Sequence, residues 1–204
     1  MKIERIHAHQ DPRFSQVCLN QHGCFLADGI PFEVEILFGK NAVIRGDASE
    51  FYPAVIQEFR QYAPHVTRFF DDLGHVVTEF PDPCLLTIPL SSIQPSQFCV
   101  DEEKVQAIQQ FITSPEDIVI PLACCNGQYT AMDGHTRLYY AAAKGWDHVC
   151  AIKQPAEAWL SKMVKEIQAR GVRTPNDLTL LSHTDYEAQW LSFCHRFFAE
   201  LDKD

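Results

Sequence analysis

The chain has 204 residues, and its 46% hydrophobic and 11% aromatic residues are typical of a well-packed domain and not of a disordered chain. Seventeen basic residues against 27 acidic ones give a formal net charge of −10 with His neutral, and no basic stripe is visible, so nucleic-acid binding is not expected. No apolar run approaches the roughly 20 residues that cross a bilayer, and the charged start does not resemble a signal peptide, so we expect a cytoplasmic protein without a membrane partner.

Eight cysteines are spread along the chain, and no C-x-x-C pair occurs among them. This spacing supports neither a disulfide framework nor a zinc site. We therefore expect buried, reduced thiols and no metal site.

Residues 1–82 predict an N-terminal subdomain that begins with a β-hairpin. Apolar stretches over 24–38 flank Asp28-Gly29, a dipeptide typical of the two-residue type I′ turn. Residues 41–46 predict a further strand next to this hairpin.

A long amphipathic helix is predicted after that strand, with Ser49 as its N-cap and apolar residues at helical spacing. Pro64 kinks or divides the helix, and Gly74 ends it. The apolar run 75–80 predicts a strand.

Residues 83–153 alternate between strand and helix patterns. The predicted order is a strand over 84–93, a helix over 101–112, strands over 117–123 and 127–133, a helix over 135–144 and a strand over 148–152. This alternation predicts a mixed α/β fold.

Residues 154–204 predict a C-terminal helical segment. Its first helix covers 156–171, and Thr174 and Pro175 form an N-cap and N1 pair that predicts another helix start. The last helix carries an aromatic face made of Tyr186, Trp190, Phe193 and Phe197. We expect this face to pack on the rest of the protein.

The pentapeptide Asp133–Arg137 lies between a predicted strand and a predicted helix. Gly134 allows the backbone to approach a ligand closely, and the first amides of a helix favour phosphate or another anion. The histidine and arginine add donor or cationic side chains, and the threonine adds a hydroxyl. The motif predicts a phosphate-binding loop; the alternative is a capped helix in which Asp133 is only a turn residue.

The loop over 94–98 is the second candidate wall of this pocket. Ser96 and Gln97 offer short polar groups after a proline. Phe98 either stacks on a base or fills the core.

Residues 85–152 resemble the ParB/sulfiredoxin-like superfamily, which includes the ParB-like nuclease domain, in their proline-containing loop, short helix, strand and glycine-led motif. The resemblance covers about one third of the chain. Sulfiredoxins carry Gly-Cys-His-Arg and CTP-binding ParB proteins carry Gly-Glu-Arg-Arg, so His135 stands where their cysteine or glutamate is. The motif is most similar to that of the free-serine kinases of the superfamily, which carry Asp-Gly-His-(His/Thr)-Arg.

The resemblance implies a ParB/sulfiredoxin-like core that binds a nucleoside di- or triphosphate with Mg²⁺. The residues it implies as phosphate ligands are Gly134, His135, Thr136 and Arg137, helped by Ser96 and Gln97. It places Asp133 near the transferred group and makes His135 a candidate catalytic residue. The His-Glu pair that supplies the base of those kinases is absent here, so either Glu102 or Glu103 substitutes for it, with Glu103 the candidate, or both glutamates only occupy the first helical turn. We therefore expect phosphoryl transfer to a small, serine-like hydroxyl compound. The alternative is a non-catalytic nucleotide-responsive module that regulates a protein or DNA, and a nuclease is disfavoured because no carboxylates cluster for a two-metal site.

Overall fold

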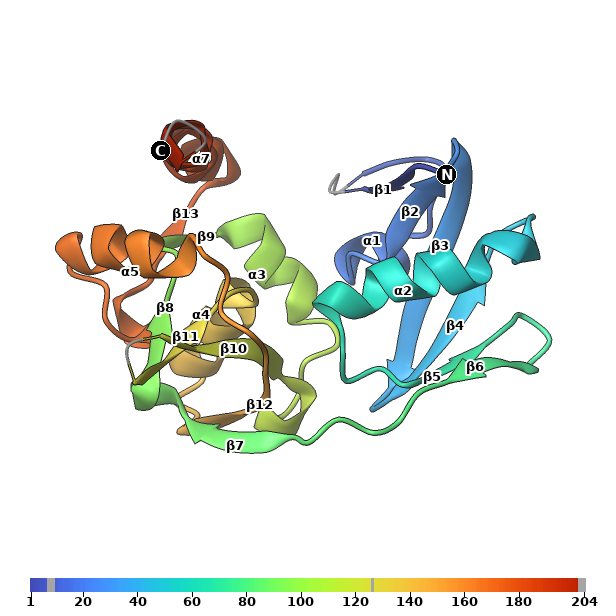
Figure 1. Ribbon diagram of the computed structural model, residues 1–204, viewed down its shortest axis with the longest axis horizontal. Helices are drawn as coiled ribbons and strands as arrows, with labels where there is room; N and C mark the ends of the chain where they lie inside the picture. The colour runs from blue at the N-terminus through green and yellow to red at the C-terminus, as the bar shows by residue number, and fades with distance from the viewer. Residues whose placement is uncertain (7–9, 126, 202–204) are drawn as a thin grey trace. The chain divides into compact units, whose positions relative to one another are not determined.

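The structure, a computed structural model, describes residues 1–6, 10–125 and 127–201. It divides into two compact units, Met1–Cys84 and Leu85–Asp204, which Figure 1 draws from blue to red. Both units combine helices with sheets, so the fold is mixed α/β as the sequence predicts. In the described residues, no helix is both long and apolar enough to span a bilayer.

The described part of the first unit forms a six-stranded sheet in the order β1-β2-β3-β4-β5-β6. Its strands are β1 (Ile3–Arg5), β2 (Cys24–Ala27), β3 (Ile30–Phe38), β4 (Asn41–Arg45), β5 (Arg68–Phe70) and β6 (Val76–Glu79). The β4–β5 pair is parallel and the other neighbours are antiparallel. Helix α2 (Tyr52–Tyr62) buries Val55, Ile56 and Phe59 against this sheet, and the short helix α1 (Gln16–Asn20) lies on β3.

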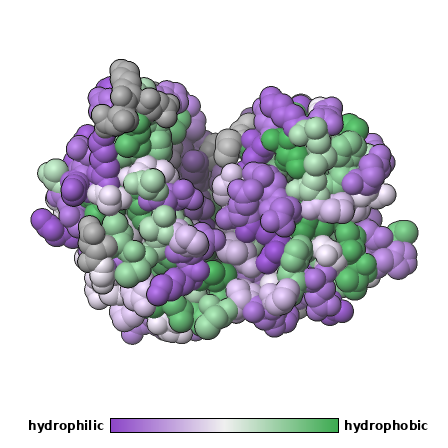
Figure 2. Space-filling view, viewed as in Figure 1, coloured by the Kyte–Doolittle hydropathy of each residue, from purple (hydrophilic) through white to green (hydrophobic). Residues whose placement is uncertain are grey.

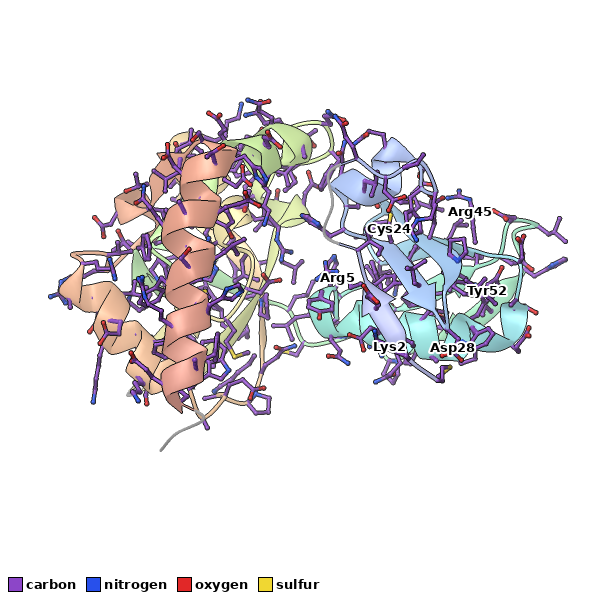
Figure 3. The ribbon with its side chains drawn as sticks, turned by 90° about the horizontal axis from the view of Figure 1, so that it is seen from above. Lys2, Arg5, Cys24, Asp28, Arg45 and Tyr52 are labelled. Atoms are coloured by element: carbon purple, nitrogen blue, oxygen red, sulfur yellow. The ribbon has the colours of Figure 1, made fainter. Side chains whose placement is uncertain are left out.

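The predicted hairpin is confirmed, since β2 and β3 pair antiparallel around Asp28-Gly29. Both residues have positive φ, 48° and 86°, as a type I′ turn requires. The backbone N–H of Lys2 donates to Asp28 Oδ1 at 2.7 Å, which ties the start of the chain to the turn (Figure 3).

The predicted helix from Ser49 to Gly74 is wrong at both ends. Ser49 is not the N-cap; a 3₁₀ turn (Ser49–Phe51) precedes α2, with Ala48 as its cap. At the other end α2 stops before Pro64, because a residue preceding proline is disfavoured in helical geometry. Arg68, Phe69 and Phe70, which follow, form β5, and this strand pairs with β4.

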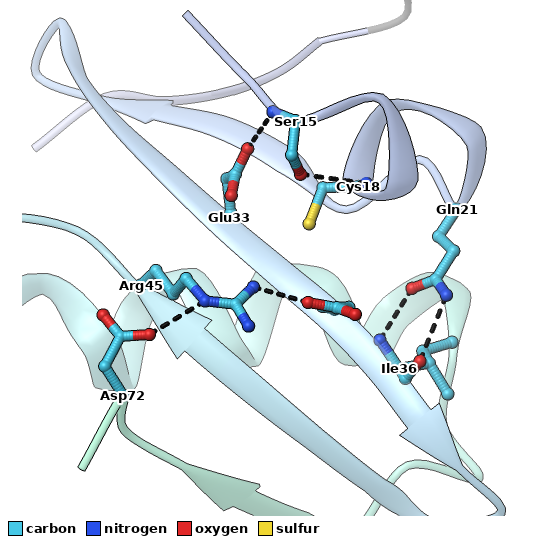
Figure 4. Close-up of polar contacts among 8 residues, drawn as sticks. Ser15, Cys18, Gln21, Glu33, Ile36, Arg45 and Asp72 are labelled. Carbon is cyan, nitrogen blue, oxygen red and sulfur yellow. Dashed lines mark hydrogen bonds and ion pairs between the residues drawn. The ribbon is translucent and has the colours of Figure 1, made fainter.

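Side chains join the connecting segments of the first unit to its sheet (Figure 4). Arg45 Nη1 donates to Glu35 Oε2 at 2.6 Å, and its Nε lies 2.8 Å from Asp72 Oδ1 in the β5–β6 connection. Gln21, next to α1, accepts from the N–H of Ile36 at 2.7 Å and donates to the carbonyl of the same residue at 3.1 Å. These contacts tie both connections to β3 and β4.

The described part of the second unit forms a five-stranded sheet in the order β7-β12-β10-β11-β8 and a two-stranded sheet, β13-β9. The strands are β7 (Leu86–Pro89), β8 (Ile93–Pro95), β9 (Cys99–Asp101), β10 (Val119–Cys125), β11 (Gln128–Ala131), β12 (His148–Lys153) and β13 (Thr179–Leu181). The helices are α3 (Glu102–Ile108), α4 (His135–Ala143), α5 (Leu160–Ala169), α6 (His183–Tyr186), a π-helical turn (Glu187–Leu191) and α7 (Ser192–Leu201), with 3₁₀ turns at Leu90–Ser92, Pro115–Asp117 and Pro175–Asp177. Helices α3, α4, α5 and α7 contribute to one hydrophobic core with the larger sheet.

Two predictions for this unit are wrong. The single strand over 84–93 is interrupted by the 3₁₀ turn Leu90–Ser92, because β7 and β8 lie at opposite edges of the sheet and the chain must cross between them. Thr174 and Pro175 are an N-cap and first-turn pair as predicted, but the expected helix is wrong, because they begin only one 3₁₀ turn, which leads to strand β13. There Asp177 Oδ2 accepts from the backbone N–H and the hydroxyl of Thr174, at 2.8 and 3.0 Å, and so stabilises the turn.

The aromatic face of the last helical segment is confirmed as a packing surface. Tyr186, Phe193 and Phe197 are buried, and Trp190 is partly buried against the same core.

The molecular surface mixes polar and apolar residues. Figure 2 shows hydrophilic residues with hydrophobic ones between them on the visible face of both units, which is ordinary for proteins.

The structure describes all eight cysteines, and all are free thiols. Cys18, Cys24 and Cys99 are buried as expected, whereas Cys84 and Cys124 are exposed, so the expectation of burial is wrong for these two. Burial raises the pKa of Cys18 to about 11 and that of Cys99 to about 12. Both thiols therefore stay protonated and unreactive at neutral pH.

Candidate functional site

Two parallel strands of the second unit end side by side at the candidate site. Strands β8 and β11 pair in parallel with Pro95 opposite Ala131. The segments that follow them, 96–98 and 132–134, therefore both leave the sheet at the carboxyl ends of these strands. Ligands of open α/β sheets commonly bind outside the carboxyl ends of strands.

Gly134 joins β11 to α4 in a backbone conformation that only glycine fits here. It is the N-cap of α4 with φ 82° and ψ 21°, in the left-handed region. An added Cβ would lie 2.7 Å from Ile120 Cδ1 and 2.9 Å from Arg137 Nη2. A side chain at this position would therefore have to displace Ile120 on β10 and Arg137 on α4, in addition to adopting a left-handed conformation.

Helix α4 begins at His135, as the sequence predicts, and its N-terminus has no side-chain cap among the described residues. The first intrahelical bond comes from the N–H of Leu138, which donates to the carbonyl of Gly134 at 2.9 Å. The amides before it in the first turn have no carbonyl of the preceding turn to bond with, and the positive end of the helix dipole adds to theirs. This terminus suits an anion.

Arg137 lies beside this terminus in a partly buried position, with a side chain that is 20% exposed. Its Nη1 donates to the carbonyl of Val119 on β10 at 2.7 Å, and its Nη2 lies 3.6 Å from the half-exposed carboxylate of Asp133. Burial lowers the pKa of the guanidinium from its ordinary value, but arginine remains charged in proteins. A positive charge is therefore held beside the N-terminus of α4.

His135 links the two walls of the site as a neutral ring. Its side chain is almost fully buried, and Nε2 accepts from the backbone N–H of Ser96 at 3.0 Å. Burial lowers the pKa of His135 to about 4, so the ring is uncharged at neutral pH. Of the two roles that the sequence suggested for His135, cation or donor, the cationic one is corrected, because the buried ring is neutral and its Nε2 accepts from the Ser96 loop.

Strand β8 and the loop that follows it carry buried polar side chains. Ser96 and Gln97 are both buried, and Gln97 Nε2 donates to the carbonyl of Cys99. Gln94, which the sequence did not single out, is fully buried and donates through Nε2 to the carbonyl of Val172 at 3.0 Å. A polar residue in a strand gives little sign of such burial, because its partner lies 78 residues away in the chain.

Phe98 is partly buried and packs against the hydrophobic core, which favours the second of the two alternatives for this side chain. Its ring packs edge-on against Trp190 and Phe193, with centroids 5.4 and 5.7 Å apart. The guanidinium of Arg170 lies 4.7 Å from the Phe98 centroid. Phe98 therefore anchors the C-terminal helical segment.

Glu103 is exposed in the first turn of α3, where its backbone N–H donates to Asp101 Oδ1 at 2.9 Å. Asp101 is fully buried and caps α3, and its Oδ2 accepts from Nδ1 of His183 at 2.7 Å. The sequence analysis missed this Asp–His pair because 82 residues separate its members. In the described residues, no group of three or more His, Cys, Asp or Glu side chains could hold a metal ion.

Comparison with known proteins finds only distant likeness. No family model and no curated protein sequence matches this chain. Among solved structures, protein Atu1540 from Agrobacterium tumefaciens is similar with a TM-score of 0.35 and 14% identity, and the match covers 48% of this chain and 62% of that one. Sulfiredoxin from Arabidopsis thaliana is similar with a TM-score of 0.30 and 18% identity, over 36% of this chain and 88% of that one.

Proposed function

We propose that the Asp133–Arg137 loop binds the phosphates of a nucleoside di- or triphosphate and that the protein transfers a phosphoryl group to a small hydroxyl compound. One observation carries this proposal. Gly134, in the left-handed conformation, places the uncapped N-terminus of α4 next to the charge of Arg137. Free first-turn amides, the helix dipole and a neighbouring guanidinium each favour an anion, which supports the proposal.

The proposed roles follow from where the side chains lie. Thr136, partly exposed in the first turn, offers its hydroxyl to a phosphate oxygen, and Arg137 balances the charge that develops during transfer. His135 holds the first-turn amides against the Ser96 loop. The Asp133–Arg137 sequence resembles that of the free-serine kinases, which favours a serine-like acceptor.

Mg²⁺ would enter as the partner of the nucleotide. This ion commonly binds through phosphate oxygens and one or two carboxylates, and it keeps several waters. The half-exposed carboxylate of Asp133 beside the loop fits that need and would hold the ion. Mg²⁺ bound there supplies charge neutralisation to the phosphates.

A non-catalytic nucleotide-responsive module is the second candidate. The observation that favours it is the position of Glu103, whose exposed side chain on α3 is not fixed as a base. A binding module needs the anion site alone. Transfer activity therefore separates the two candidates, and nucleotide binding is common to both.

A thermal-shift screen of ADP, ATP, CTP and GTP with Mg²⁺ tests the anion site. A nucleotide at 100 times its dissociation constant should stabilise the wild-type protein by about 2.7 kcal/mol. Arg137→Ala should lose this shift, whereas Arg173→Ala should keep it, because Arg173 is an exposed residue outside the loop. A folded wild-type protein that ignores all four nucleotides would contradict the proposal.

A further inference from the structure

Asp101 and His183 form a buried carboxylate–histidine pair outside the Asp133–Arg137 loop. Strands β9 and β13 pair in parallel with Asp101 opposite Leu181, so both end at the same level. Asp101 is the last residue of β9, and His183 is the first residue of α6. The Nδ1–Oδ2 distance is 2.7 Å; the carboxylate is fully buried and the ring is 38% exposed.

The hydrogen bonds of this pair define its chemistry. Asp101 Oδ1 accepts from the N–H of Glu103 and Oδ2 accepts from His183 Nδ1, so the carboxylate is held on both oxygens. A carboxylate on Nδ1 holds the proton there and leaves Nε2 as the basic nitrogen of the neutral ring. His183 Nε2 lies 3.6 Å from Oε1 of Glu187, whose side chain is half-exposed.

The charged groups around His183 all favour proton uptake. The hydrogen bond from Asp101 raises the pKa of His183 above its ordinary value, and Glu103 and Glu187 act in the same direction. A histidine whose ring is oriented by a carboxylate in this way can act as a proton acceptor.

The pair belongs to the same part of the fold as the anion site. Ser96, which bonds to His135, precedes Asp101 by five residues, a span of at most about 18 Å of extended chain. Helix α4, which presents the anion site, packs on both β9 and α3. These contacts of α4 link the proposed anion site to β9 and α3, the elements that carry Asp101 and Glu103.

We propose that His183, oriented by Asp101, is the general base of the phosphoryl transfer, an inference that rests on the proposed function. The acceptor oxygen attacks the terminal phosphorus of the nucleotide and forms the new P–O bond. The P–O bond to the shortened nucleotide breaks, and its electron pair stays on the departing phosphate oxygen. The proton of the acceptor hydroxyl moves to Nε2 of His183 and from there to water. Asp101 is a positioning residue that keeps Nε2 basic.

The test compares nucleotide binding with turnover in three variants. Turnover is the loss of the terminal phosphate from the nucleotide that stabilises the wild-type protein, with L-serine, L-threonine, glycerol or water as acceptor. His183→Gln should bind the nucleotide with an unchanged thermal shift while turnover falls by about 100-fold or more. Asp101→Asn, which retains a helix-capping side chain, should lower turnover and move the acid limb of the pH profile to lower pH. His195→Gln changes an exposed histidine of α7 and should match the wild type in both measurements.

The outcomes separate the two proposals. Turnover of His183→Gln within about threefold of the wild type would overturn the role of His183 alone. A wild-type protein that binds the nucleotide and transfers phosphate to none of the four acceptors would overturn both this role and the proposed transfer, and would leave the non-catalytic module. Absence of any nucleotide shift in the wild type would overturn the proposed function and this inference with it.

Discussion

Two Asp-Gly dipeptides, Asp28-Gly29 and Asp133-Gly134, serve different structural purposes in the two units. Both glycines have positive φ, 86° and 82°. At Gly29 an added Cβ would meet no atom of the described residues within 4 Å, whereas at Gly134 it would meet Ile120 and Arg137 below 3.0 Å. The first dipeptide needs only a backbone angle. The second also needs space, and that need comes from residues on another strand and on the helix that follows.

The carboxylates of the two dipeptides differ in the same way. Asp28 Oδ1 accepts a hydrogen bond from the backbone of Lys2 at 2.7 Å and so helps to build the sheet. Asp133 Oδ2 lies 3.6 Å from Arg137 Nη2, and its side chain is 55% exposed beside the uncapped start of α4. The local motif is shared, but only the second copy lies at the uncapped start of a helix beside an arginine.

The largest effect is expected for a substitution of Gly134, which tests whether this glycine needs space as well as a backbone angle. Gly134→Ala should lower the free energy of unfolding of the second unit by about 3 to 4 kcal/mol, because left-handed strain and a steric clash add. Urea denaturation followed by tryptophan fluorescence measures this, since Trp146, Trp159 and Trp190 all belong to that unit. A loss below about 1 kcal/mol would show that Ile120 and Arg137 move aside easily.

The next largest effect is a pH dependence of stability, and it is expected in only one of the two units. Ile30, which follows Gly29, does not titrate, whereas His135, which follows Gly134, does. The folded pKa of His135 is about 4 against about 6.5 when unfolded, so between these values the unfolded chain binds more protons. Stability from this group is fully present above pH 6.5 and should fall by about 3 kcal/mol as the pH drops to 4. Denaturation midpoints of wild type and His135→Gln across this range measure it. Equal pH slopes for the two proteins would refute the burial of a neutral ring.

The smallest effect is expected at the hairpin. Gly29→Ala keeps open space around its new methyl group, so only the backbone angle is strained, at a cost of about 1 kcal/mol. Hydrogen exchange of peptides from residues 1–84, read by mass spectrometry, isolates the first unit. A loss as large as that of Gly134→Ala would remove the distinction between the two dipeptides.

Local chemistry explains the elements that were predicted correctly. Asp28-Gly29 specifies its hairpin because the angles of a type I′ turn depend on two adjacent residues. The start of α4 at His135 follows from Gly134 and the helical spacing after it. The aromatic face of Tyr186, Phe193 and Phe197 follows from periodicity alone.

Pairing between distant segments explains the elements that were predicted wrongly. Residues 68–70 continue a helical apolar pattern, but they become β5 because β4 offers a partner strand. Thr179–Leu181 becomes β13 for the same reason, since it pairs with β9. Propensity over a few residues is weak against such tertiary contacts.

The sequence by itself determined the mixed α/β class, the hairpin, and a glycine-led strand–turn–helix motif, since each depends on neighbours along the chain. Only the tertiary structure decided that His135 is buried and neutral, that Phe98 packs in the core, and that Asp101 meets His183. Burial and long-range hydrogen bonds fix the charge of these groups, and both depend on residues far away in the chain.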